Sequence, residues 1–135
     1  MSAGNISPEG DFLPAKRDTG MCGEDIACRY LAAKGYRILS RNYRGGRCEL
    51  DIIAEIGETI VFCEVKTART GRYGSPVTWV TPGKIRHIAR AAREYILSHA
   101  IGGRSFRFDV IGLEAGEGGF TVTHIENAFN APPDV

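Results

Sequence analysis

Two short segments of the chain place acids and a lysine at spacings that suit phosphodiester chemistry. Glu49 and Asp51 lie two residues apart in the first segment, and Glu64 and Lys66 lie two residues apart in the second. Carboxylate oxygens are hard ligands that suit Mg²⁺ or Mn²⁺, which keep positions open for water and phosphate oxygens. A metal held in this way polarises a phosphodiester and lowers the pKa of a bound water, while a lysine stabilises developing charge. If the four side chains converge, they predict metal-assisted phosphodiester hydrolysis.

A β-hairpin must bring the two segments together. Residues 47–55 and 59–66 are rich in β-formers, and Ile56 and Gly57 lie between them at a plausible turn. We expect Glu55 to pair with Glu58 across a two-residue turn. Because side chains alternate along a strand, three contacts follow: Glu49 opposite Glu64, Arg47 opposite Lys66, and Asp51 diagonal to Glu64.

In this register the other face of the hairpin is wholly apolar and suits burial under a helix. Its members are Cys48, Leu50, Ile52, Ala54, Val61, Cys63 and Val65. A slip of one residue would scatter the charges into the core, so the apolar face favours the register that gathers the acids. A second interpretation fits the same spacing: Lys66 and Arg47 neutralise the acids on an ordinary salt-bridged outer face of an exposed sheet.

The basic residues are segregated, although 17 basic and 16 acidic side chains leave a net charge of only +1. Residues 27–47 and 66–93 contain no acid, and arginine, whose planar guanidinium suits phosphate contact, outnumbers lysine 13 to 4. We expect these blocks to form a phosphate-facing surface. Its members are Arg44, Arg47, Arg69, Arg72, Lys84, Arg86, Arg90 and Arg93. The alternative for any one of them is a solvated side chain paired with a distant acid.

Helices and further strands flank the predicted hairpin. The patterns predict helices over residues 23–34 and 81–100, and strands over 36–42, 106–113 and 120–125, with a loop over 69–80. Gly35 is placed to end the first helix, and Thr81 to cap the second. The order α-β-β-β-α-β-β predicts an α/β fold with a small sheet flanked by helices. We expect a flexible N-terminal tail at 1–20, one domain at 21–130 and a C-terminal tail at 131–135.

Composition indicates a soluble protein. A chain of 135 residues fits one domain, and no apolar run approaches the ~20 residues that span a bilayer. The N-terminus lacks the pattern of a signal peptide, so we expect a cytoplasmic protein with no membrane partner. Its four cysteines show no metal-binding spacing and are expected to be reduced.

The chain resembles a known nuclease superfamily. Asp51, followed after twelve residues by Glu64-Val65-Lys66, is similar to the PD-(D/E)xK signature. An ordered series of further residues resembles the small bacterial YraN-like family. The series is Gly23-Glu24, Ala27, Tyr30-Leu31, Gly35-Tyr36, Asn42-Tyr43-Arg44, Glu49-Leu50-Asp51, Phe62 to Lys66, Lys84 and Phe108-Asp109-Val110.

The resemblance implies a restriction-endonuclease-like fold with a mixed central sheet. It implies Asp51 and Glu64 as ligands of Mg²⁺ or Mn²⁺ and Lys66 as the catalytic lysine. Glu49 matches the family's first acid, and Glu24 matches a helical acid that related junction-resolving enzymes place near the metal. Two positions depart from the pattern: Leu50 replaces the proline of the superfamily signature, and Cys48 replaces the usual family glycine.

The predicted function is that of a metal-dependent nuclease-like protein that acts on DNA, including branched or repair intermediates. Two alternatives are a nucleic-acid-binding module without turnover and a protein-interaction subunit whose acids are structural. A homodimer is compatible with the resemblance, since resolvase-like relatives act as dimers.

Overall fold

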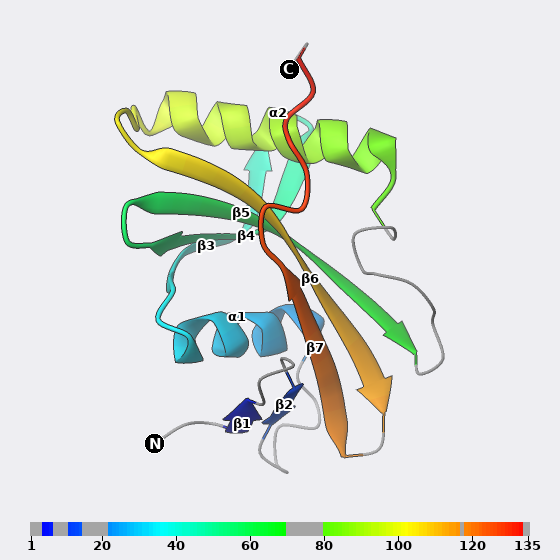
Figure 1. Ribbon diagram of the computed structural model, residues 1–135. Coiled ribbons are helices and arrows are strands. Elements are labelled where there is room, and N and C mark those ends of the chain that lie inside the picture. The colour runs from blue at the N-terminus through cyan, green and yellow to red at the C-terminus, as the bar shows by residue number, and fades with distance from the viewer. Residues whose placement is uncertain (1–3, 7–10, 15–21, 70–79, 117, 134–135) are drawn as a thin grey trace.

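The computed structural model describes residues 4–6, 11–14, 22–69, 80–116 and 118–133 (Figure 1). Within these ranges the chain forms two helices, α1 (Gly23–Ala33) and α2 (Pro82–Ser98). The same described residues form seven strands: β1 (Gly4–Ile6), β2 (Asp11–Pro14), β3 (Arg37–Gly45), β4 (Cys48–Ile56), β5 (Thr59–Arg69), β6 (Ser105–Gly116) and β7 (Gly119–Ile125). From α1 onward, this is the predicted order α-β-β-β-α-β-β.

The strands form one mixed sheet in the order β1-β2-β7-β6-β5-β4-β3. β5 and β6 are parallel and are joined through α2, while the other neighbours are antiparallel. The two helices cover opposite faces of the sheet (Figure 1). The predicted α/β class, with a mixed sheet flanked by helices, is therefore confirmed.

Local signals at the helix ends agree with the sequence. The Thr81 hydroxyl accepts a hydrogen bond from the Lys84 backbone N–H at 3.1 Å, which caps α2, and Pro82 occupies the first helical position. Gly35, with a φ of 95°, follows the last turn of α1, where a left-handed residue ends the helix. Both boundaries could be predicted because a cap is a contact between residues close in sequence.

The predicted hairpin forms, but its register differs by two residues. Ile56 pairs with Thr59 and Glu55 with Ile60, so the turn consists of Gly57 and Glu58. Gly57 has a φ of 58°, which glycine adopts without strain, and this favours the turn that begins at Gly57. A shift of two residues keeps every side chain on its face but changes which residues oppose one another.

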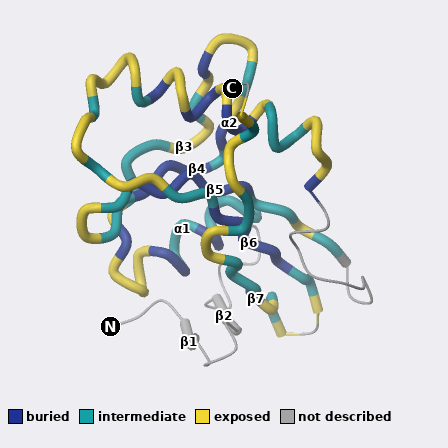
Figure 2. The backbone as a smooth tube through the Cα atoms, turned by 45° about the horizontal axis from the view of Figure 1, so that its top comes forward, coloured by how far each residue is buried: buried dark blue, intermediate teal, exposed yellow. Residues whose placement is uncertain are grey.

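The prediction of one apolar and one polar face was also wrong. Ile52, Ala54, Val61, Cys63 and Val65 pack against α1, whereas Cys48 and Leu50 pack on the α2 side. Ile53, Ile60 and Phe62 are buried on the α2 side as well. Figure 2 shows β4 and β5 buried along much of the centre of the fold. These strands have helices on both faces, which excludes the interpretation of an exposed outer face.

The N-terminal segment contributes two strands that its sequence pattern did not predict. β1 pairs with β2, and Asp11 and Phe12 of β2 pair with Thr121 and Phe120 of β7. Strands this short carry too few residues to show a periodicity, and pairing with the edge of β7 stabilises them. Residues 4–6 and 11–14 therefore form strands at one edge of the sheet, and the division of the chain at residues 21 and 130 stays a prediction.

Within the described residues, neither helix has the length and apolar character required to cross a membrane.

Candidate functional site

The candidate site begins at an irregularity in the β3–β4 pair. Side chains two residues apart on a regular strand share a face. In β3 and β4, however, two cross-strand pairs that lie two residues apart along each strand face different helices. These pairs are Arg41–Ile52 on the α1 side and Tyr43–Leu50 on the α2 side. The change of face occurs at Asn42 and Asp51, which lie between the pairs. Asn42 has a φ of 52°, a conformation that asparagine tolerates better than most residues.

Asp51 links β4 to β5 through its side chain. The last pair of the β4–β5 ladder on this side is Ile52–Cys63. Beyond it, the Asp51 carboxylate accepts a hydrogen bond from the Val65 backbone N–H at 2.8 Å. A carboxylate that accepts from a backbone N–H is held in a defined position. The change of face therefore leaves Asp51 fixed beside β5, next to Glu64.

Glu64 is the buried acid of the site. It is 2% exposed, and its Oε1 has no hydrogen-bond partner within the described structure. Its Oε2 lies 3.4 Å from Nζ of Lys66 and 3.8 Å from Nζ of Lys84. Burial, followed by the nearby charge of Asp51, raises the pKa of Glu64 to about 7, although the two lysines oppose this shift.

Glu24 approaches the same region from the first turn of α1. A side chain at the neighbouring Gly23 would lie 2.6 Å from Oγ1 of Thr67 on β5, so the glycine permits a close approach of the helix. A hollow of about 400 Å³ lies beside this contact and is lined by Glu24, Asn42, Asp51 and Thr67, among others. Burial and then the charge of Asp51 raise the pKa of Glu24. Figure 1 shows α1 lying across one face of the sheet.

Glu49, which was predicted to face Glu64, does not reach it. Its Oε2 lies 2.9 Å from Nη2 of Arg44 on the neighbouring strand, and both side chains are exposed. The physical reason is the two-residue shift in register, which places Asp51 rather than Glu49 beside Glu64. The structure therefore gathers Glu24, Asp51, Glu64 and Lys66, and excludes Glu49.

Lys84 is the residue whose place sequence reasoning missed. It was predicted to contact nucleic acid, but it lies in the first turn of α2 with its ammonium group against Glu64. Asn42 was matched only as part of the family series, yet its side chain hydrogen-bonds to Glu24. The cap at Thr81 fixes where α2 begins, but no local pattern indicates that this end meets β5.

Asp51 and Glu64 are the residues that could hold a metal. The unbonded, buried Oε1 of Glu64 and the adjacent Asp51 carboxylate offer hard oxygen ligands. Among the described residues there is no group of three or more His, Cys, Asp or Glu side chains arranged to hold a metal ion. Two carboxylates suit Mg²⁺, which commonly keeps several waters and takes its remaining ligands from substrate phosphates.

Three of the predicted basic residues meet at one groove of about 550 Å³ between α2 and the β3–β4 turn. Arg47, Arg90 and Arg93 line it, together with the acid Glu94. In the described part of the chain none of the three arginines forms an ion pair, unlike Arg44, which pairs with Glu49. Gly45 lines the groove as well, and a side chain there would lie 2.9 Å from Cβ of Glu94.

The other predicted basic residues do not line this groove. Arg86 has interactions of its own. The side chain of Arg69 and the whole of Arg72 lie outside the described residues.

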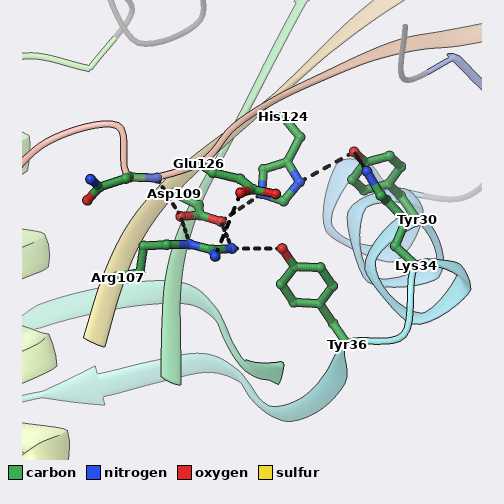
Figure 3. Close-up of polar contacts among 8 residues, drawn as sticks. Tyr30, Lys34, Tyr36, Arg107, Asp109, His124 and Glu126 are labelled. Atoms are coloured by element: carbon green, nitrogen blue, oxygen red, sulfur yellow. Dashed lines mark hydrogen bonds and ion pairs between the residues drawn. The ribbon is translucent and has the colours of Figure 1, made fainter. Parts of the chain in front are cut away.

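A second polar network fastens α1 to the sheet (Figure 3). Asp109, fully buried on β6, accepts hydrogen bonds from Arg107 at 2.8 and 2.9 Å and is bonded to Nε2 of His124 at 2.7 Å. The other ring nitrogen of His124 lies 3.3 Å from the hydroxyl of Tyr30 on α1. Arg107 also donates to the hydroxyl of Tyr36 at 2.7 Å. The network satisfies its buried polar groups and holds the helix that carries Glu24.

Comparison with known proteins places these residues in a family. The model of "Uncharacterised protein family UPF0102" matches residues 23–113, a span that contains Glu24, Asp51, Glu64 and both site lysines. A UPF0102 protein of Pelobacter propionicus is 44% identical over 126 residues, which cover 91% of this chain and 90% of the relative. One of Alkaliphilus oremlandii is 46% identical over 112 residues, which cover 82% and 96%.

Among solved structures, the chain is similar to Pyrococcus furiosus SfsA in complex with Ca²⁺. The sequence identity is 16% and the TM-score is 0.36, and the match covers 92% of this chain and 69% of SfsA.

Proposed function

We propose that this chain, which belongs to the UPF0102 family, is a metal-dependent nuclease-like protein that hydrolyses nucleic-acid phosphodiesters, with DNA as the favoured substrate. One observation carries the proposal. A buried carboxylate, Glu64, has an unbonded oxygen beside a second carboxylate, Asp51, and two lysines approach its other oxygen. A carboxylate in such a place is costly unless a cation or hydrogen-bond donor completes its surroundings.

In this proposal Asp51 and Glu64 hold a Mg²⁺ or Mn²⁺ ion. When bound, such an ion polarises the phosphodiester and supplies a water of lowered pKa. The Val65 N–H fixes the Asp51 carboxylate, so that acid needs little rearrangement to act. Lys66 is placed to stabilise charge that develops on the phosphate, since its side chain remains about one-third exposed next to Glu64. Glu24 borders the hollow beside Asp51 and supports the site from α1.

The groove lined by Arg47, Arg90 and Arg93 supports nucleic acid as the substrate. Its arginines lie on α2 and the β3–β4 turn, and the same helix and strand pair carry Lys84 and Asp51. Arginines without carboxylate partners are available to bind phosphates. A phosphate backbone that follows this groove would run along α2 towards the acidic site.

Metal binding is tested directly by thermal unfolding. We expect Mn²⁺ or Mg²⁺ to raise the midpoint temperature of unfolding of the wild-type protein. A ligand that binds only the folded state stabilises it by about 2.7 kcal/mol at 100 times its Kd. Asp51→Asn and Glu64→Gln should lose this shift. Glu49→Gln is the matched control, because Glu49 lies two residues from Asp51 on the same strand but is exposed and pairs with Arg44. An equal metal shift in all four proteins would contradict the assignment.

Cleavage is tested with the same variants on linear, flapped and four-way DNA and on RNA, with Mg²⁺, Mn²⁺ or EDTA. We expect metal-dependent cleavage by the wild type and by Glu49→Gln, and none by Asp51→Asn. Equal cleavage by Asp51→Asn would indicate a contaminating nuclease and would remove the claim of turnover.

One observation favours a second candidate, a nucleic-acid-binding module without turnover. Lys66 and Lys84 both lie within 4 Å of Glu64 and balance its charge without a metal. This candidate predicts nucleic-acid binding that is insensitive to EDTA and no metal-dependent shift in unfolding.

A further inference from the structure

An apolar hollow of about 330 Å³ lies between α2 and β6. Leu97, 65% exposed, and Phe106, 38% exposed, both line it and are the large hydrophobic side chains that stand exposed within the described structure. Its volume falls within the ~300–1,000 Å³ typical of pockets for small ligands. Exposed apolar side chains gathered at one hollow indicate a binding surface more strongly than scattered ones do.

Aromatic rings form one wall of this hollow. Phe106 stacks on Phe62 with ring centroids 6.1 Å apart and an angle of 21° between the planes. Phe62 is itself fully buried and contacts the ring of Phe108 at 5.6 Å. The buried ring of Phe62 supports Phe106 from one side, so Phe106 presents a partly exposed aromatic surface to the hollow.

The hollow adjoins the arginine groove. Arg93 and Leu97, one turn apart on α2, line both cavities. Arg93 and Leu97 therefore separate two cavities of different character. The groove on one side is cationic, with Arg47 and Arg90, and the hollow on the other side is aromatic and aliphatic. A nucleotide has the same division of character, with an anionic phosphate and a flat base that stacks on aromatic side chains.

We propose that this hollow receives an unpaired nucleobase of a DNA strand whose phosphates lie in the arginine groove. The inference rests on the proposed function and narrows its substrate to DNA with a single-stranded segment. A base held in a duplex is already stacked and cannot enter, whereas an unpaired base stacks at no cost in pairing. The site thereby distinguishes flaps, overhangs and gaps from blunt duplex.

Charge argues against a second copy of the chain as the occupant. A symmetric dimer through this face would bring the same surface of both copies together. Arg93 lines both the hollow and the arginine groove. A dimer through the hollow would therefore bring the arginine grooves of the two copies close together. Like charges that face each other across an interface oppose association.

The test compares binding of a single-stranded oligonucleotide with binding of a blunt duplex, both in EDTA so that no cleavage occurs. Phe106→Ala should weaken single-strand binding roughly 5- to 150-fold, the range for removal of one stacked base, and leave duplex binding unchanged. Phe106→Trp keeps an aromatic surface and should retain binding. A melting curve of each variant checks that it folds, since Phe106 is partly exposed and its replacement should be tolerated.

Each outcome has a distinct meaning. Equal weakening on both substrates, or no weakening on either, overturns the proposal, as does a concentration-dependent dimer that Phe106→Ala dissociates. If the Asp51 variants show no metal effect but Phe106 still governs single-strand binding, the nuclease proposal fails and base recognition stands. If metal-dependent cleavage is found but Phe106→Ala binds single strands as the wild type does, only the base site fails.

Discussion

The Nζ atom of Lys84 lies 3.8 Å from Oε2 of Glu64, although the two residues are twenty positions apart and belong to different elements. This ion pair joins the first turn of α2 to the strand that carries the signature acid and lysine. Of the two lysines near Glu64, Lys84 exerts the larger effect on the pKa of that acid. The site is therefore composed of β4, β5 and both helices rather than of a hairpin alone.

Replacement of Lys84 should impair the site through Glu64. We expect Lys84→Met to lower cleavage about 10- to 100-fold, the usual effect of removing a group that orients a metal ligand, and to change the Mn²⁺ concentration for half-maximal activity. Lys34→Met is the control. Lys34 follows the last turn of α1, at the opposite end of that helix from Glu24, and its ammonium group donates to the Tyr30 hydroxyl. Steady-state cleavage across a metal titration measures both quantities, and an unchanged metal dependence for Lys84→Met would refute its role.

The arginine groove should determine the salt dependence of binding. Replacing Arg90 and Arg93 together with glutamines should reduce the slope of log K against log salt by about 0.9 for each duplex phosphate that the protein no longer neutralises. Arg37→Gln serves as the control, since Arg37 is exposed but pairs with Glu55 at 3.1 Å. Binding isotherms at several salt concentrations give the slopes. An equal decrease for Arg37→Gln would show a general charge effect instead of a groove.

Gly23 should be required for the close approach of α1 to β5. In Gly23→Ala the new methyl group would lie 2.6 Å from Oγ1 of Thr67, and overpacking of this kind costs about 1–3 kcal/mol. We also expect a weaker metal shift, because the helix that carries Glu24 must move. Gly83→Ala in α2 is the matched control: its nearest neighbour is 4.0 Å away, so stability should be unchanged or increase by up to about 1 kcal/mol. Chemical denaturation of both variants measures the difference.

The network around Asp109 should make the protein sensitive to acid. Burial alone would raise the pKa of Asp109, but hydrogen bonds from His124, Arg107 and the Asn127 backbone outweigh it and hold the pKa below its ordinary value. A depressed pKa in the folded state stabilises the protein above the unfolded value, near 3.9, and this contribution is lost as the pH falls through the lower folded value.

Asp109→Asn should therefore lose stability at pH 7, by about 3 kcal/mol, since it leaves a buried ion pair without its anion. Its free energy of unfolding should change less between pH 5 and pH 2 than that of the wild type. Denaturation series at several pH values measure both slopes. Parallel slopes for the two proteins would show that Asp109 does not contribute to the acid sensitivity.

The sequence by itself determined the elements and the types of residue at the site. The caps at Thr81 and Gly35 and the order of helices and strands from α1 onward follow from patterns among near neighbours, and each is present in the structure. These features could be predicted because the interactions that produce them span only a few residues.

The tertiary structure alone decided which of those residues meet. A two-residue shift in a hairpin preserves the alternation of faces, so the sequence could not distinguish Glu49 from Asp51 as the neighbour of Glu64. The change of face at Asn42 and Asp51 and the arrival of Lys84 depend on α1 and α2 packing against opposite sides of the sheet. Such interactions join residues far apart in the chain, and their energies come from burial that no local pattern records.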